Sequence, residues 1–393
     1  MSHLLISRSP DLKRLRDEGY DLEIRSGHLL VKDVPYVSPG RVVKKGTLIS
    51  TLVLAGDVTA KPDTHVAYFA GEHPCYENGA EIEKIKHWTG QKQLAEGIDV
   101  QHSFSAKPTS GSYEDYYTKV TTYVQVISGF AEKVDPSVTA KTFPVLKPEN
   151  DESPFNYIDT ASARAEIGII TKKLELSKVA IVGLGGTGSY VLDLVAKTPV
   201  KEIHLFDGDI FFQHNAFRSP GAPSVEELDG KPFKTARFKE VYSKMHRGIV
   251  EHSRFVSLEN VEELKGMAFV FLCLDRGAAK KMVIEKLEEY DLPFIDVGMG
   301  IVATNGSLGG ILRVTASSPG QRDHFRARVP FSDDDGGNEY NRNIQIADLN
   351  ALNAALAVIH WKKSLGFYRD HKTGIHSTYT IDGNLLLTEG LNS

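Results

Sequence analysis

Apolar positions recur with different spacing in the two parts of the chain. In the first part, runs typical of β-strands cover residues 28–34, 48–54 and 118–127, and turn-forming glycine and proline residues separate the first two runs. From residue 155 onward, short apolar runs alternate with stretches of helical periodicity. Such alternation is typical of a mainly parallel sheet with helices on both faces. The pattern therefore predicts a smaller β-rich (α+β) domain followed by an α/β domain with a Rossmann-like sheet.

The second part divides into alternating strands and helices. Buried strands are predicted at residues 178–182, 202–206, 268–274 and 293–296, and a weak strand at 254–257. Helices are predicted from the glycine cluster to residue 197, at 233–245 and at 277–290. Apolar residues between 346 and 359 repeat at helical spacing, which indicates a helix packed on the core. The last segment, residues 378–388, has the pattern of a hairpin.

A charged segment bounded by proline separates the two parts. Residues 147–154 have the sequence KPENDESP, a composition typical of a linker. We therefore expect an N-terminal domain over residues 1–146, a linker over 147–154 and a second domain over 155–393.

Composition and charge exclude several classes of protein. The 393 residues are 41% apolar and 25% charged, as in ordinary globular proteins. The net charge of −5, from 51 acidic and 46 basic residues, argues against a general nucleic-acid or membrane binder. The longest apolar run, residues 267–274, is too short to span a bilayer, and the N-terminus lacks a signal-peptide pattern. We expect a cytoplasmic protein without nucleic-acid or membrane partners.

Two cysteines, Cys75 and Cys273, limit the metal and disulfide chemistry. A four-cysteine zinc site or a disulfide framework is not possible within one chain, so no structural zinc is expected. Cys273 lies in an apolar run and is interpreted as a small core residue. His65, His73 and Cys75 have a spacing that fits no standard zinc pattern.

A glycine cluster follows the predicted strand at residues 178–182. It has the sequence GLGGTG, with glycine at positions 183, 185, 186 and 188, and a predicted helix follows it. Glycine permits a tight turn and a close approach of the backbone to phosphate. The amino end of a helix offers free N–H groups and a positive dipole end to an anion. Gly183, Gly185, Gly186 and Gly188 therefore predict a nucleotide-binding turn.

An acidic residue ends the next strand. Asp207 lies nineteen residues after Gly188, the usual place for a carboxylate that binds a ribose hydroxyl. An NAD-dependent oxidoreductase and an adenylating enzyme both fit these features.

Cations and further acids near the strand ends favour a triphosphate over a dinucleotide. In chain order they are Asp209, Asn215, Arg218, Lys234 and Asp275. Cleavage between the α- and β-phosphates builds negative charge that cations stabilise. A carboxylate at a strand end can hold Mg²⁺. This set therefore favours an enzyme that binds ATP and Mg²⁺.

The ordered set resembles the ThiF/MoeB/ubiquitin-activating superfamily of adenylating enzymes, from about residue 159 to the C-terminus. The resemblance implies that the four loop glycines cradle ATP and that Asp207 binds the ribose, with Asp209 as the second acid of the same turn. It implies that Asn215 and Arg218 contact the phosphates and that Asp275 binds Mg²⁺. The family lysine falls on Lys234, with Lys231 as a rival because the local spacing differs by one residue.

Family members usually dimerise and offer an arginine to the partner's ATP site. Arg164 is the candidate for this role, and a homodimer is expected. The first domain looks like the uncharacterised domain found ahead of certain bacterial ThiF-type modules, and we expect it to recognise a partner or substrate. The resemblance implies a ubiquitin-like protein and a ubiquitin-conjugating-like enzyme as partners in a bacterial ubiquitination-like pathway.

Transfer of the acyl group is a separate question. Ubiquitin-activating members carry a catalytic cysteine after the sheet crosses over, whereas residues 315–341 of this chain contain none. One hypothesis is direct transfer of the adenylate to an outside nucleophile. The other is an oxyester on Ser317 or Ser318, with Ser332 also in this region, although a serine needs a base to become a good nucleophile. His324 is near in sequence.

The sequence thus predicts attack by a protein C-terminal carboxylate on the α-phosphate of ATP, with release of pyrophosphate. Three alternatives stay open. The acyl group can belong to a sulfur carrier or a short peptide, the glycine loop can serve an NAD-dependent oxidoreductase, or the domain can be a non-catalytic scaffold.

Overall fold

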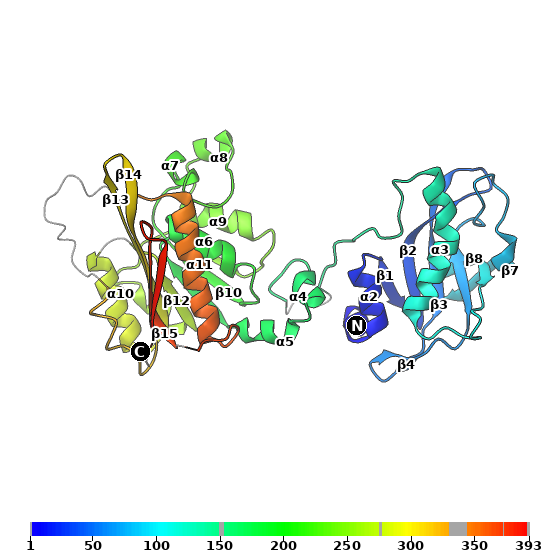
Figure 1. The fold of residues 1–393 in the computed structure, drawn as a ribbon, viewed down its shortest axis with the longest axis horizontal. Coiled ribbons are helices and arrows are strands. Elements are labelled where there is room, and N and C mark those ends of the chain that lie inside the picture. The colour runs from blue at the N-terminus through cyan, green and yellow to red at the C-terminus, as the bar shows by residue number, and fades with distance from the viewer. Residues whose placement is uncertain (1, 149–152, 275–276, 330–343, 372, 391–393) are drawn as a thin grey trace. The chain divides into compact units, whose positions relative to one another are not determined.

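The computed structural model describes residues 2–148, 153–274, 277–329, 344–371 and 373–390. The chain divides into two compact units, residues 1–149 and 150–393. Both are drawn in Figure 1, and each is described by itself below.

Unit 1 is built on an antiparallel sheet of six strands in the order β1-β2-β3-β6-β8-β7. Its elements are α1 (Ser2–Arg8), α2 (Pro10–Asp17), β1 (Leu22–Arg25), β2 (His28–Val37), β3 (Val43–Thr51), β4 (Leu54–Ala55), β5 (Val58–Thr59), β6 (Val66–Ala70), a 3-10 turn (Glu83–Ile85), β7 (Lys86–Ala95), β8 (Ile98–Ser105) and α3 (Tyr116–Val134). Helix α3 packs on the sheet, and its buried Tyr123 and Ile127 share a core with Leu29 and Phe69.

The strand predicted at residues 118–127 is wrong, because this segment lies inside α3. Its threonines and valines have high β-propensity. However, buried side chains recur at Tyr116, Val120, Tyr123 and Ile127, and Asp115 caps the helix by accepting a hydrogen bond from the Thr118 N–H. The apolar stripe and the cap outweigh the local propensity.

Unit 2 has a sheet of eight strands in the order β11-β10-β9-β12-β13-β14-β15-β16. Its elements are α4 (Thr160–Arg164), α5 (Gly168–Thr171), β9 (Lys178–Val182), α6 (Gly186–Val195), β10 (Glu202–Phe206), α7 (Gln213–Ala216), α8 (Val225–Asp229), α9 (Lys234–Tyr242), β11 (Ile249–His252), β12 (Phe269–Leu272), α10 (Gly277–Glu289), β13 (Phe294–Thr304), β14 (Ser307–Ser317), α11 (Ala347–Ser364), β15 (Gly374–Thr380) and β16 (Leu385–Gly390), with 3-10 turns at Lys172–Leu174 and Val261–Gly266.

The strands from β11 to β13 run parallel, and the strands from β14 to β16 are antiparallel to their neighbours. Helices α6 and α11 pack together over one face, where Val179 and Ile181 of β9 contribute to the core. On the opposite face, Ala180 and Val182 pack with Ile284 and Leu287 of α10. Adjacent residues of β9 are therefore buried on both sides, as its continuous apolar run predicts. The predicted fold class is confirmed for both units.

Two local predictions in unit 2 need correction. Residues 254–257 are not a strand, because the edge strand β11 ends at His252. Cys273 is not inside a strand, because β12 ends at Leu272, and its side chain is half-buried. Strands β9 and β10 have the predicted bounds.

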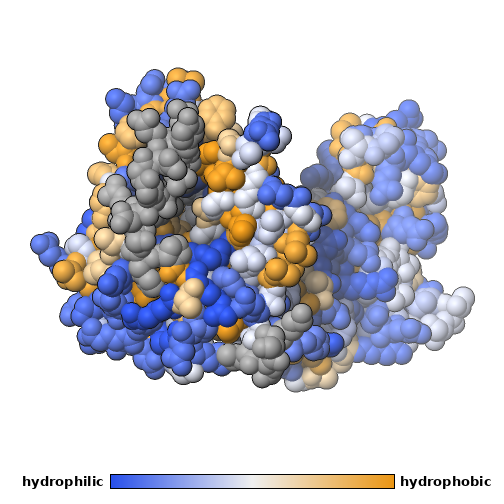
Figure 2. Space-filling view, turned by 60° about the vertical axis from the view of Figure 1, so that its left-hand side comes forward, coloured by the Kyte–Doolittle hydropathy of each residue, from blue (hydrophilic) through white to orange (hydrophobic). Residues whose placement is uncertain are grey.

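Figure 2 shows hydrophobic patches scattered among hydrophilic side chains on the surface that faces the viewer. Within the described part of the chain, none of the helices has the length and apolar character needed to cross a membrane.

Candidate nucleotide-binding site

The glycine turn joins β9 to α6 in a conformation that only glycine allows easily. Gly183 has a φ of +91°, which side chains with a Cβ rarely adopt. A Cβ on Gly188 would lie 1.9 Å from the carbonyl oxygen of Gly183, so the first turn of α6 is folded tightly back on the loop. A Cβ on Gly185 would meet no atom within 4 Å. The turn therefore leaves open space at the amino end of α6, where an anion is favoured.

Asp207, one residue beyond β10, is buried and holds this turn. Its Oδ2 accepts a hydrogen bond from the Leu184 N–H at 2.7 Å, and its Oδ1 accepts one from the Asp209 N–H at 2.8 Å. The carboxylate thus joins the end of β10 to the glycine loop of β9. A carboxylate has about four acceptor positions, so these two bonds leave capacity for ribose hydroxyls.

Lys234 is the buried cation of the site, with an exposed fraction of 5%. Its Nζ lies 2.7 Å from Asp209 Oδ2 and 3.5 Å from Asp207 Oδ2. The backbone places it there, since the Lys234 N–H donates to the Asp209 carbonyl oxygen at 3.0 Å and a β-bridge joins Ile210 to Phe233. The start of α9 is therefore fixed against the turn after β10.

Lys231, the rival candidate, has a different environment. It is exposed and has a φ of +45°. The structure brings Lys234, rather than Lys231, to the two aspartates.

Asn215 lies in the short helix α7, and Arg218 lies just after its end. Asn215 is buried, and its Oδ1 accepts a hydrogen bond from the Phe212 N–H at 2.9 Å. The half-buried Arg218 has a buried Nε without a hydrogen-bond partner among the described residues. A buried guanidinium nitrogen without a partner is costly, so an anionic ligand here would satisfy a group that the described chain leaves open.

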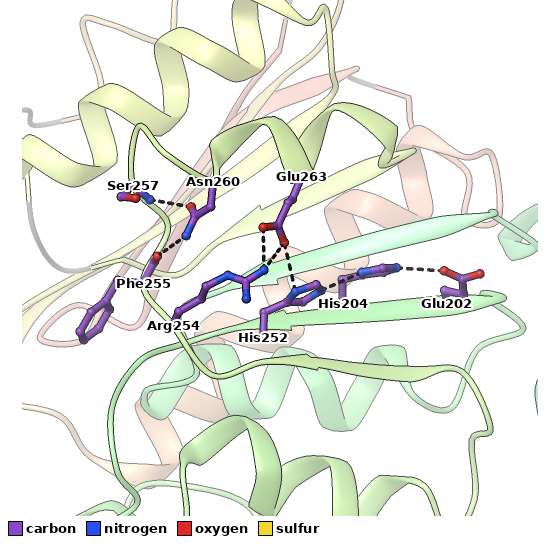
Figure 3. Close-up of polar contacts among 8 residues, drawn as sticks. All are labelled: Glu202, His204, His252, Arg254, Phe255, Ser257, Asn260 and Glu263. Atoms are coloured by element: carbon purple, nitrogen blue, oxygen red, sulfur yellow. Dashed lines mark hydrogen bonds and ion pairs between the residues drawn. The ribbon is translucent and has the colours of Figure 1, made fainter.

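A polar network joins β10 to the edge strand β11 and the 3-10 turn that follows it, and Figure 3 shows its side chains. His204 and His252 lie with Nδ1 and Nε2 3.0 Å apart, and Glu202 and Glu263 each contact one end of this pair. Burial, and then the neighbouring His204, lower the pKa of His252. The His252 carbonyl oxygen accepts a hydrogen bond from the Asp207 N–H at 3.3 Å. The network therefore anchors β11 where it meets the site.

Two other predicted residues are placed differently. Asp275 lies outside the described residues, and the described chain reaches Leu274 just before it. Arg164 is exposed at the end of α4, which Asp159 caps by accepting from the Ser162 N–H at 3.0 Å.

The two candidate acyl acceptors are not brought to the glycine loop. In the β13–β14 pairing, Ser317 lies opposite Phe294, at the amino end of β13, whereas the loop lies at the carboxyl ends of β9 and β12. The buried Ser317 Oγ accepts from Arg322 at 3.1 Å. His324 Nε2 contacts the Ala316 carbonyl oxygen at 2.8 Å, so this nitrogen is a donor and not a base for a serine. Ser318 follows Ser317 at the same edge, and Ser332 lies outside the described residues.

The described residues do not include a cluster of metal-ligating side chains. They contain no group of three or more histidine, cysteine, aspartate or glutamate side chains placed to hold a metal ion. In unit 1, Cys75 donates to the His73 carbonyl oxygen and His65 contacts Ser105 Oγ. For Mg²⁺ at the ATP site, Asp209 is the more exposed of the two aspartates, and a Mg²⁺ ion that keeps most of its waters needs only one or two carboxylates.

The sequence patterns did not indicate two asparagines of α11 that reach the glycine loop. Asn350 and Asn353 are buried and line a cavity with Gly185, Gly186 and Gly298. The signal was present, since two asparagines three residues apart interrupt the apolar stripe at Leu349, Leu352 and Leu356.

Comparison with known families decides the identity of unit 2. The model of the ThiF family matches residues 160–384, more than half of the chain. The chain belongs to the ThiF family. This confirms the predicted resemblance to the ThiF/MoeB/ubiquitin-activating superfamily of adenylating enzymes. A domain of unknown function, DUF6791, matches residues 10–160, in agreement with the predicted uncharacterised N-terminal domain.

Solved structures with similarity to this ThiF-family chain share little sequence with it. The crystal structure of PaaA is 20% identical over 57% of this chain and 75% of that chain, with a TM-score of 0.44. The microcin C7 biosynthetic enzyme MccB in complex with N-formylated MccA is 15% identical over 78% of this chain and 96% of that chain, with a TM-score of 0.47. E. coli MccB with ATP is 17% identical over 57% and 66%, with a TM-score of 0.44. No curated protein matches the chain.

Proposed function

We propose that this ThiF-family chain uses ATP and Mg²⁺ to adenylate the C-terminal carboxylate of a ubiquitin-like protein. The carboxylate attacks the α-phosphorus, the bond to the bridging oxygen of the β-phosphate breaks, and pyrophosphate leaves. The nucleophile is already ionised, so the chain has to position and stabilise charge rather than remove a proton.

The observation that carries the proposal is the burial of Lys234 between Asp207 and Asp209 beside an open glycine turn. A dinucleotide site needs the acid and the glycines but has no use for a lysine fixed over the same strand ends. A polyphosphate needs the lysine, because the cation stabilises the charge that develops during transfer. The unpartnered Nε of Arg218 is a second cationic group suited to the same ligand.

For the second step, we favour direct transfer of the adenylate to the cysteine of a conjugating enzyme. The placement of Ser317 at the amino end of β13 and the donor role of His324 Nε2 speak against the oxyester route through these residues. The crossover segment contains no cysteine, so the activated acyl group has no thiol acceptor there.

A homodimer with Arg164 acting in the partner's site is part of the proposal. The exposure of Arg164 at the end of α4 is compatible with this role. Unit 1 is proposed to recognise the protein partner. A cytoplasmic location completes the proposal.

The deciding test is ATP–pyrophosphate exchange with a purified small β-grasp protein ending in glycine, encoded beside this chain. Exchange should require that protein and Mg²⁺ and should collapse in Asp275→Ala. Exchange that occurs with a short peptide or a sulfur carrier, but not with the β-grasp protein, would assign the alternative acyl group. Binding of NADH without any exchange would support the oxidoreductase alternative.

A further inference from the structure

The cavity beside the glycine loop contains polar atoms without partners. It has a volume of about 40 Å³ and lies between Gly186, Gly298 and the two asparagines of α11. Asn350 and Asn353 are almost fully buried, with exposed fractions of 1% and 0%. Nδ2 of Asn350 and Oδ1 of Asn353 have no hydrogen-bond partner among the described residues. Buried polar atoms are normally hydrogen-bonded, so these two atoms point to a ligand.

The hydrogen bonds of the two asparagine side chains indicate which of their amide atoms are free for a ligand. Asn353 Nδ2 donates to the Gly298 carbonyl oxygen at 3.0 Å. A carbonyl oxygen can only accept, so this amide cannot be turned round, and its free atom is the acceptor Oδ1. The Thr187 hydroxyl donates to Asn350 Oδ1 at 2.9 Å, and in this orientation of the amide Nδ2 is the free donor. The cavity therefore offers one donor and one acceptor.

This pair of atoms excludes a ligand that only accepts hydrogen bonds. Ionised phosphate and carboxylate oxygens cannot satisfy Asn353 Oδ1. The C-terminal residue of a peptide chain can satisfy both atoms, because its N–H donates and its carboxyl oxygens accept. The position also fits, since a Cβ on Gly186 would lie 2.1 Å from Asn350 Nδ2. Asn350 thus lies directly on the turn where the α-phosphate of the proposed ATP would meet the acyl group.

We propose that Asn350 and Asn353 are specificity-determining residues for the C-terminal residue of the acyl substrate. Asn353 Oδ1 accepts from the N–H of that residue, and Asn350 Nδ2 donates to the carboxyl oxygen that stays free of phosphorus. This inference rests on the proposed function and narrows its substrate class. The terminal residue is a small one joined through a secondary amide, and a terminal proline, which has no N–H, is excluded.

Binding of non-hydrolysable acyl-adenylate analogues to the full chain tests the proposal. The first probe is acetyl-alanyl-glycyl sulfamoyladenosine. The second is its depsipeptide, in which an ester oxygen replaces the last N–H. Calorimetry should show roughly tenfold tighter binding of the amide to the natural chain, the usual effect of leaving a buried acceptor unsatisfied. Asn353→Ala should abolish this ratio and leave the ATP affinity within about twofold, because Asn353 makes no phosphate contact in this proposal.

Asp348→Ala is the matched control, because Asp348 is exposed on the same helix, and it should keep the ratio. In a Trp88→Phe background, the fluorescence of buried Trp361 checks that unit 2 of each variant is folded. Equal affinity of the natural chain for amide and ester would overturn the inference, as would a ratio that persists in Asn353→Ala. If the natural chain binds ATP but binds both analogues no more tightly than AMP, only the inference fails. If it binds none of these molecules, the proposed adenylation fails as well.

Discussion

Two of the buried lysines, Lys119 of unit 1 and Lys234 of unit 2, have opposite kinds of partner. Lys119 of unit 1 donates to the Ser50 hydroxyl at 2.8 Å and to the Thr64 carbonyl oxygen at 2.9 Å. Both partners are neutral, and burial lowers the pKa of Lys119 to about 8. Lys234 of unit 2 is buried to a similar extent but lies between two carboxylates.

The difference separates a cation held by the core alone from one in an environment suited to a ligand. A cation among neutral groups is costly to bury, and its position in the core between helix α3 and the sheet gives it no access to a ligand. A cation between two acids at the carboxyl ends of parallel strands lies where nucleotides bind in this class of sheet. Burial alone therefore does not distinguish the two lysines, whereas the charged partners and the position at the strand ends do.

Lys234→Ala should give the largest effect. We expect pyrophosphate exchange to fall by about 10²–10³-fold, the usual loss when one group that stabilises the transition state is removed. Radiolabelled pyrophosphate exchange measures it, with thermal unfolding as the check that unit 2 is folded. An exchange rate within threefold of the natural chain in a folded variant would remove Lys234 from the chemistry.

His360→Gln tests the effect of acid on unit 2. Burial is the main cause that lowers the pKa of His360 to about 4. Between that pKa and the ordinary value of about 6.5, the unfolded state binds more protons, so folding stability falls as the pH falls. We expect protonation of His360 in the unfolded state to lower the free energy of unfolding by about 2 kcal/mol between pH 7 and pH 5.

Urea unfolding of unit 2, followed by Trp361 fluorescence in a Trp88→Phe background, measures this loss at the two pH values. The glutamine variant should lose about 2 kcal/mol less than the natural chain, since it carries no titrating ring. Equal losses in both proteins would show that His360 does not remain neutral in the folded state.

Lys119→Met tests the neutral environment of unit 1. Because its pKa is lowered in the folded state, Lys119 loses its proton there at a lower pH than in the unfolded state. The free-energy cost of burying its charge therefore shrinks as the pH rises above 8. The folding stability of the natural chain should rise by about 1 kcal/mol relative to that of the variant between pH 7 and pH 9. Hydrogen exchange of the α3 amides measures this gain. A pH-independent difference between the two proteins would contradict the assignment.

Lys231→Ala should give the smallest effect and serves as the control for Lys234→Ala. Lys231 is exposed between α8 and α9, and its backbone has a φ of +45°. We expect exchange within about twofold and a stability change below about 0.5 kcal/mol, as for most surface substitutions. A loss as large as that of Lys234→Ala would reverse the choice between the two lysines.

Local patterns predicted the parallel core of unit 2 because its strands are buried on both faces. The continuous apolar runs at residues 178–182 and 202–206 became β9 and β10 with the same bounds. The strand predicted at residues 118–127 was wrong because threonine and valine favour strands locally. The burial of Tyr116, Val120 and Tyr123 depends instead on the packing of α3 against the sheet.

The candidate site was predictable where residues follow strands directly. The spacing of the glycine loop, Asp207 and Lys234 led to side chains that the structure brings together. The asparagines were missed because α11 reaches the loop only through tertiary packing. The position of Ser317 depends on the register that sets it opposite Phe294, and a register between strands is not encoded in the spacing of either strand alone.

The bridge between Ile210 and Phe233 has a consequence for how this site can change. Together with the bond from the Phe211 N–H to the Pro232 carbonyl oxygen at 2.8 Å, it closes the neck of the excursion that contains α7 and α8. Insertions or exchanges around α8, beyond Arg218, would leave Lys234 and its aspartates in register. The sequence of that outer part can thus change while the cluster of Lys234, Asp207 and Asp209 behind the neck keeps its geometry.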